Sequence, residues 1–233
     1  MMEHFNAFNR TFWIIHRKGS ISSCFARRTK IAFKVNSYSY HNFPYLCAQI
    51  QTKPKMKNII VISTSLRQGS NSDILADKFI EGAKAAGHNV EKISLKGKDI
   101  KFCMGCLACQ KLGKCVIKDD ANAIMENVLN ADVVCWATPI YYYEMSGQMK
   151  TLIDRMNAMY PKDYKFREVY LLTTAAENEE FVPKRAESGL TGWIDCYGKS
   201  ELKGHIFCGG VGAPKEIEGN AKLQEAYELG KQV

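Results

Sequence analysis

Four cysteines stand within thirteen residues, and thiols spaced this closely indicate metal or redox chemistry. Successive thiolates in a compact loop can surround a 4Fe-4S cluster, and the two glycines of the run would ease the chain reversal. Three alternatives stay open: a structural zinc site, a disulfide, and thiols that bind no metal. Zinc frameworks usually separate two Cys-x-x-Cys pairs by a longer spacer, which disfavours zinc. The run reads Cys103-Met-Gly-Cys106-Leu-Ala-Cys109-Gln-Lys-Leu-Gly-Lys-Cys115.

A polar loop over residues 63–72 could bind a phosphate, because it brings hydroxyls, Arg67 and Gly69 to the start of a predicted helix. Helix N–H groups and the helix dipole stabilise an anion there, and Asn71 can donate a hydrogen bond. The loop matches neither the ATP P-loop nor the Rossmann pattern, so a monophosphate such as FMN is favoured. Alternatively, these residues only end a strand and cap a helix. A loop of about ten residues exceeds the usual two to six, which favours binding.

These segments need a scaffold, and the apolar pattern predicts alternating strands and helices. Buried strands are predicted over residues 58–63, 90–95, 132–138, 168–174 and 203–208. Helices are predicted over residues 72–86, 146–156, 182–197 and 221–230, and one more begins at Asp119-Asp120. Buried strands with intervening helices indicate a parallel sheet covered on both faces, which binds ligands outside the carboxyl ends of its strands. The phosphate loop and the cysteine run both follow strand ends.

The order of motifs resembles the flavodoxin-like NADPH-dependent FMN reductases, and within them the iron-sulfur flavoprotein branch. The resemblance covers residues 57–233. It implies an α/β fold, a flavodoxin-like doubly wound five-stranded parallel sheet with helices on both faces, which binds one FMN per subunit. Leu66 and Thr64 stand where such loops often carry proline and glycine, which bears on affinity rather than on the type of ligand. The motifs are Ser-x-Arg-x-Gly-x-Asn-Ser at 65–72, the cysteine run, Thr138-Pro-Ile-Tyr141, Ser146-Gly-Gln-Met-Lys150 and Ile153-Asp-Arg155.

The resemblance also implies where the cofactors bind. The FMN phosphate would be held by Ser65, Arg67, Gly69, Asn71 and Ser72. The isoalloxazine would lie over Pro139, Ile140, Tyr141 and Tyr142, with Thr174 and Ala175 as a weaker candidate for a third wall. The tyrosines could instead form a packed or dimer surface. A 4Fe-4S cluster on Cys103, Cys106, Cys109 and Cys115 would exchange single electrons with FMN.

The implied function is that of an FMN-dependent oxidoreductase. NADPH or NADH would reduce the bound FMN, which would pass electrons to a small-molecule or protein acceptor, and the flavin would carry the chemistry without a catalytic side chain. The alternative is a non-enzymatic iron-sulfur/FMN electron carrier. A homodimer or homotetramer is expected, since flavin sites in this family are commonly completed near subunit interfaces.

Other reactive side chains are assigned to structure. No hydrolase triad or metal-hydrolase site competes. His88 and His205 are expected to be structural, and Lys150, Asp154 and Arg155 to form a helix surface with ion pairs. The remaining cysteines of this part are expected to be ordinary buried thiols: Cys135, Cys196 and Cys208.

The basic charge of the chain lies in residues 1–55, which hold nine Lys and Arg against the single acid Glu3. Residues 56–233 are neutral overall and form the predicted FMN-binding domain, so nucleic-acid binding is not inferred. The extension is interpreted as a misassigned start or a disordered arm, with a targeting segment as the alternative. No apolar stretch approaches the ~20 residues that span a bilayer, so no membrane partner is expected. Clustered cysteines in a chain of 233 residues indicate a reducing, cytoplasmic location.

Overall fold

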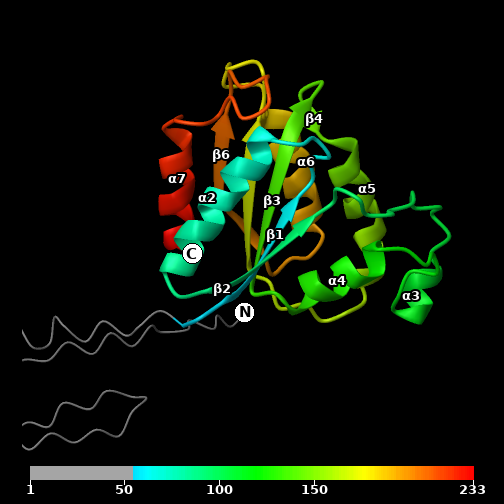
Figure 1. Cartoon of the computed structure of the whole chain (residues 1–233). Helices are drawn as coiled ribbons and strands as arrows, with labels where there is room; N and C mark the ends of the chain where they lie inside the picture. Colours follow the sequence, from blue (N-terminus) through cyan, green and yellow to red (C-terminus); the bar gives the residue numbers. More distant parts are fainter. Residues whose placement is uncertain (1–54) are drawn as a thin grey trace, which may run out of the picture. The chain divides into compact units, whose positions relative to one another are not determined.

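Five parallel strands form the central sheet of the computed structural model, which describes residues 55–233 (Figure 1). The predicted extension, apart from Lys55, lies outside the described residues. The strands lie in the order β2-β1-β3-β5-β6, and a two-residue strand, β4 (Glu144–Met145), pairs antiparallel with the end of β3. This order confirms the predicted doubly wound sheet. The five strands are β1 (Asn58–Ser63), β2 (Asn89–Ser94), β3 (Val133–Tyr141), β5 (Glu168–Thr174) and β6 (Glu201–Cys208).

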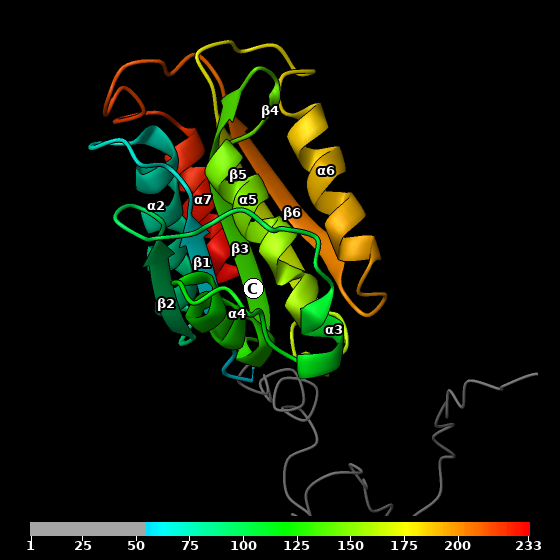
Figure 2. The same cartoon turned by 90° about the vertical axis from the view of Figure 1, so that its right-hand side faces the viewer.

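Helices cover both faces of the sheet (Figure 2). One face packs against α2 (Asn71–Ala85) and α7 (Lys222–Lys231). The opposite face packs against α4 (Ala121–Asn130), α5 (Gly147–Arg155), the 3₁₀ helix η1 (Met156–Met159) and α6 (Lys184–Asp195). The central strands β1 and β3 are therefore buried on both faces over most of their length, which explains the apolar runs 59–62 and 133–137. No helix within residues 55–233 is long and apolar enough to cross a membrane.

Three features differ from the predicted elements. Strands β2 and β6 form the two edges of the sheet and were predicted as buried, but most of their residues are exposed or partly buried. Only Ile93 of β2 and Ile206 and Cys208 of β6 are buried. The cysteine run contains a short helix, α3 (Ala108–Leu112), which the sequence pattern did not predict. Strand β4 was also not predicted, because two residues carry no periodic signal.

Candidate functional site

The phosphate loop predicted from the sequence joins β1 to α2 through residues 64–70, so it is shorter than the ten residues expected. Ser65, Ser70 and Ser72 are all buried, and the Ser70 and Ser72 hydroxyls lie 3.0 Å apart. Ser70 occupies the N-cap position of α2 but its side chain accepts no hydrogen bond from the helix. The first turn of α2 therefore keeps N–H donors that an anion can satisfy.

Two predicted phosphate ligands are held by the loop between β6 and α7, residues 209–221. The Asn71 Nδ2 donates to the carbonyls of Val211, at 3.0 Å, and Ala213, at 2.8 Å. Its Oδ1 accepts from the Ile217 N–H at 3.2 Å, and the Arg67 Nη1 donates to the Gly212 carbonyl at 2.7 Å. The amide of Asn71 thus fixes the loop in place, while Arg67 keeps further N–H groups for a ligand.

The β6–α7 loop was not part of the predicted site. Its backbone meets the phosphate loop directly, because the Lys215 N–H donates to the Gly69 carbonyl at 2.9 Å. Gly69 has a φ of +64°, and a Cβ there would lie 3.2 Å from the Lys215 side chain. The sequence signal was Gly209-Gly210-Val-Gly212 directly after the last strand, which indicates a close approach of backbones.

The predicted flavin-ring loop is a tight hairpin between β3 and β4. Ile140 pairs with Met145 and Tyr141 with Glu144, which leaves Tyr142 and Tyr143 as the two turn residues. Both have positive φ, +51° and +65°, as a type I′ turn requires. The Tyr142 side chain is 97% exposed, so nothing within the described chain packs on it.

Tyr143 connects this hairpin to the segment that follows β5. Its ring centroid lies 5.7 Å from that of Phe181. The nearby Glu177 carboxylate raises the pKa of Tyr143. The hairpin and the β5–α6 segment therefore meet above the carboxyl end of the sheet.

The third predicted wall, Thr174 and Ala175, lies at the end of β5 and is buried. Thr174 pairs in register with Pro139 of β3, so these two predicted walls are neighbours. The Ala175 N–H donates to the Cys208 carbonyl at 3.1 Å, and the Ala175 carbonyl accepts from the Val211 N–H at 2.9 Å. All eleven predicted FMN residues therefore gather at the carboxyl ends of the adjacent strands β1, β3 and β5, either in the last residues of these strands, in the segments that follow them or in the first turn of α2. Their donor set and placement fit a phosphate-bearing flavin.

The four clustered cysteines do not converge. Cys103 and Cys106 are exposed, Cys109 is buried and Cys115 is half-buried. The Asn157 Nδ2 donates to the Cys109 sulfur at 3.3 Å, which directs that thiol toward η1. Within residues 55–233, no three His, Cys, Asp or Glu side chains are grouped to hold a metal ion. The arrangement does not fit an iron-sulfur cluster without movement of the loop, so cluster binding stays a prediction.

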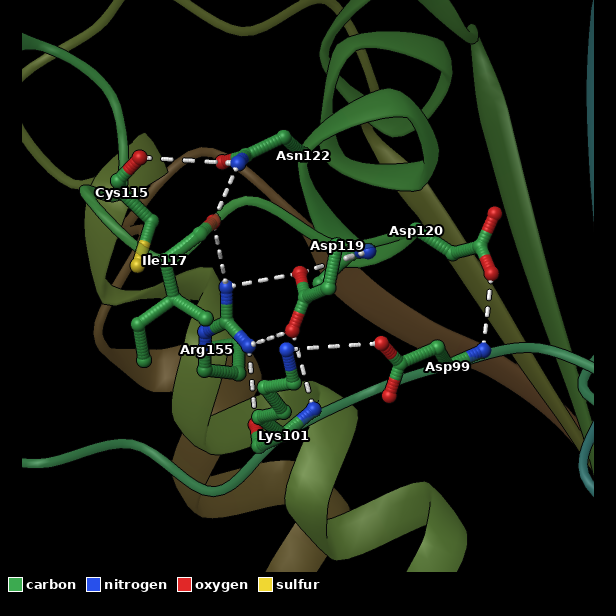
Figure 3. Close-up of polar contacts among 9 residues, drawn as sticks. Asp99, Lys101, Cys115, Ile117, Asp119, Asp120, Asn122 and Arg155 are labelled. Carbon is green, nitrogen blue, oxygen red and sulfur yellow. Dashed lines mark hydrogen bonds and ion pairs between the residues drawn. The ribbon is translucent and has the colours of Figure 1, made fainter.

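The two ends of the cysteine loop, residues 101–119, are joined by a buried ion pair (Figure 3). Arg155 of α5 contacts Asp119 through two nitrogens, at 2.5 and 2.9 Å, and neither side chain is exposed. Its Nη1 also donates to the Lys101 carbonyl at 2.8 Å, and Asp119 accepts from the Lys101 N–H at 2.9 Å. Asn122 donates to the Ile117 carbonyl at 2.7 Å. The loop is therefore closed at its base.

Charge stabilises this closure. Burial alone would raise the pKa of Asp119, but the hydrogen bonds from Arg155 and the Lys101 N–H lower it below its usual value. Burial would lower the pKa of Arg155, whereas Asp119 and the nearby Cys115 sulfur raise it. Both groups are thus charged in the folded protein.

Two structural assignments from the sequence were wrong. Arg155 was expected on a helix surface, but only its neighbours Lys150 and Asp154 form an exposed ion pair, at 2.5 Å. Arg155 lies one position past that pair and faces the core. Cys196 was expected to be buried but is exposed, because it follows the last turn of α6. Cys135 and Cys208 are buried as expected.

The histidines have the structural roles expected of them. The Lys57 N–H donates to the His88 Nδ1 at 3.3 Å, and the His88 Nε2 lies 3.1 Å from the Val233 carbonyl, so His88 joins the first strand to the C-terminus. His205 of β6 lies between Thr173, 2.8 Å away, and Glu187. Burial lowers the pKa of His205.

Comparison with known proteins places the chain in a family. The NADPH-dependent FMN reductase profile matches residues 57–184. An iron-sulfur flavoprotein of Archaeoglobus fulgidus is 36% identical over 101 residues, which are 43% of this chain and 46% of the relative. The chain thus spans about half the length of such curated relatives. An iron-sulfur flavoprotein of Methanosarcina thermophila is 24% identical over 173 residues, 74% of this chain and 91% of the relative.

Solved structures show the same fold. The NAD(P)H:quinone oxidoreductase of Methanothermobacter marburgensis superposes with a TM-score of 0.60 at 17% identity, over 76% of this chain and 96% of that one. At this identity the likeness concerns the fold alone.

Proposed function

Because the chain belongs to the NADPH-dependent FMN reductase family, we propose that it is an FMN-dependent oxidoreductase. Bound FMN would take a hydride from a reduced nicotinamide and then deliver electrons to a second acceptor. The observation that carries this proposal is the meeting of three loops at the carboxyl ends of β1, β3 and β5, beside the start of α2. This is the switch point of the sheet, where doubly wound proteins bind ligands.

The protein's contribution is to bind and orient the cofactor. Ser65, Ser72 and the first N–H groups of α2 can donate to a phosphate, and Arg67 can balance its charge. The hydrogen bonds from Arg67 and Asn71 to the β6–α7 loop keep these donors in place before the ligand arrives. The Pro139–Tyr142 segment offers one flat wall to the ring, and Thr174 and Ala175 offer another.

Removing the Arg67 charge tests the phosphate assignment. The Arg67→Ala variant should bind FMN about thirtyfold more weakly, because a charge-assisted hydrogen bond contributes about 2 kcal/mol. Riboflavin lacks the phosphate, so its affinity should change little. The measurement is flavin fluorescence titration of flavin-free protein, with Lys96→Ala as a matched control for an exposed cation. Equal loss of FMN and riboflavin would contradict the assignment.

Turnover separates the proposed reductase from an electron carrier. The FMN-loaded protein should be bleached by NADPH or NADH under anaerobic conditions and re-oxidised by a quinone or another acceptor. The measurement is stopped-flow absorbance at the flavin band. If neither nicotinamide reduces the flavin but a reduced ferredoxin does, the protein is a carrier and the reductase proposal fails.

A 4Fe-4S cluster on Cys103, Cys106, Cys109 and Cys115 remains part of the proposal, supported by the names of the relatives. No step of the proposed reaction depends on it. Iron and sulfide analysis of anaerobically purified protein, compared with Cys106→Ser, tests it. Absence of iron from the unmodified protein would leave FMN as the only bound redox group. We also propose a homodimer or homotetramer, which mass photometry would identify.

A further inference from the structure

A cavity of about 590 Å³ lies between the second half of the cysteine loop, α4 and η1, and no part of the proposed FMN site lines it. Glu126 and Leu129 line it from the second half of α4, which ends just before β3 begins. The cavity therefore lies toward the amino-terminal end of the sheet, while the proposed FMN loops follow the carboxyl ends. Figure 1 shows α4 and the β4 hairpin at opposite ends of the sheet.

The cavity has the size and wall chemistry of a small-molecule site. Its volume lies within the range of about 300–1,000 Å³ typical of ligand pockets. Met125, Leu129, Ala158 and Met159 form an apolar floor that continues into the buried core. An apolar chain or ring placed there would lose most of its contact with water.

The rim of the cavity is basic. Lys114 and Lys118 come from the cysteine loop and Lys162 from the segment after η1. Glu126 pairs with Lys162 at 2.5 Å, so one positive charge is balanced. Within residues 55–233, no carboxylate lies within ion-pair distance of Lys114 or Lys118. An apolar floor below two uncompensated cations fits a ligand with an apolar body and one anionic end.

We propose that this cavity binds an amphipathic anion, a molecule with an aliphatic or aromatic body and a carboxylate or similar acidic group. The body packs on Met125, Leu129 and Met159, and the acidic group lies between Lys114 and Lys118. Because residues 113–116 and Lys118 form one wall, the ligand contacts the part of the cysteine loop that Asn122 holds against α4. The site is independent of FMN, so its test does not depend on the flavin proposal.

Octanoate and two probes with the same chain test this proposal on the full-length protein. Octanoate carries the anion, octan-1-ol is neutral and octylammonium is positive. Amide chemical shifts in NMR titrations give both the affinity and the location. Octanoate should bind about tenfold more tightly than octan-1-ol, since two exposed charges together contribute up to about this much. It should shift the amides of Lys118, Asn122 and Glu126.

Three variants locate the binding. Lys114→Gln/Lys118→Gln should lose the preference for octanoate over octan-1-ol, while Lys84→Gln/Lys96→Gln, which removes two exposed lysines elsewhere, should keep it. Ala123→Trp places a large ring at an exposed position of the cavity wall. It should weaken the binding of octanoate and of octan-1-ol, with little effect on folding. The proposal would be overturned by equal affinity for octanoate and octan-1-ol or by no binding of octanoate. Amide shifts confined to residues outside the cavity would also overturn it.

Discussion

Tyr142 and Tyr143 occupy a backbone region that tyrosine rarely adopts, and both do so in one turn. Type I′ turns favour asparagine and glycine because these residues tolerate positive φ. A non-glycine residue there costs about 1 kcal/mol or more, and such strain is concentrated at functional sites. No packing contact of Tyr142 within residues 55–233 accounts for this strain. A contact between the ring and the flavin edge would account for it.

Replacing Tyr142 should separate stability from function. Tyr142→Asn relieves the strain and loses no packing, since the ring is 97% exposed, so the free energy of unfolding should rise by about 1 kcal/mol. If the ring contacts the flavin, the same variant should bind FMN more weakly. Urea denaturation of the flavin-free protein and a flavin titration measure the two effects.

Tyr160 provides the control for this substitution. Tyr160 is also exposed, at 61%, but its φ is −54°, so its backbone is not strained. Tyr160→Asn should therefore leave the free energy of unfolding and the affinity for FMN nearly unchanged. A Tyr142→Asn variant that is less stable and binds FMN normally would show that the turn serves folding rather than the site.

Asp119 and Arg155 form the other residue-scale feature with a measurable consequence. Asp119→Asn leaves a buried guanidinium without its counter-charge and should lower the free energy of unfolding by about 3 kcal/mol. The pKa of Asp119 is lower in the folded protein, so its stabilising effect is complete above pH 4 and declines as pH falls toward the folded pKa. The stability gap between the two proteins should thus be constant from pH 5 to 7 and shrink below pH 4.

An exposed pair tests whether burial is the cause. Lys150 and Asp154 on α5 lie 2.5 Å apart in solvent. Asp154→Asn should cost at most about 0.5 kcal/mol, because exposed pairs within one helix contribute little. Denaturant titrations at several pH values measure both variants. A similar loss for the two variants would contradict the assignment of the buried pair as the closure of the cysteine loop.

At the scale of elements, α2 and α7 pack so closely that each uses a glycine at the contact. A Cβ on Gly82 would lie 1.9 Å from the Tyr227 carbonyl oxygen, and one on Gly230 would lie 2.0 Å from that of Phe79. These helices flank the phosphate loop and the β6–α7 loop that holds it. Their separation should therefore affect the flavin site as well as stability.

The substitution Gly82→Ala should force the two helices apart and lower the free energy of unfolding by about 3 kcal/mol. It should also weaken FMN binding, because Asn71 would lose its place against Val211 and Ala213. The matched control is Gly192→Ala on α6, where nothing lies within 4 Å of the added Cβ. There the change should raise stability by about 0.5–1 kcal/mol, since alanine favours helix. A Gly82→Ala protein of normal stability would contradict this packing.

The elements themselves could largely be predicted from the sequence, because periodic burial leaves a periodic pattern. The unbroken apolar run 59–62 indicated a strand covered on both faces, and β1 is one. What could not be predicted depends on partners far along the chain. Arg155 looked like a surface residue because its buried partner, Asp119, lies 36 positions earlier in the sequence. The β6–α7 loop escaped notice for the same reason: its contacts with Arg67 and Asn71 span about 145 residues.

At the scale of the whole molecule, the proposed flavin site belongs to the sheet, whereas the cysteine loop is attached at its base to α4 and α5. Loss of the sheet's structure should therefore abolish flavin binding, and opening of the surface loop should not. The rate at which a buried thiol is alkylated measures how often the sheet opens. Cys135 in β3 has no exposed surface, and burial raises the pKa of its thiol, so alkylation requires the sheet to open.

A ligand that binds only the folded sheet should slow that alkylation in proportion to its saturation. FMN at about one hundred times its Kd should slow labelling of Cys135 roughly 100-fold, because the open state must form without the ligand. Cys196 is exposed outside the sheet and the cysteine run, so its labelling should not change. Mass spectrometry of iodoacetamide-treated protein follows both sites in one sample, and riboflavin should protect Cys135 less than FMN does. Unchanged labelling of Cys135 would mean that the folded sheet does not bind FMN.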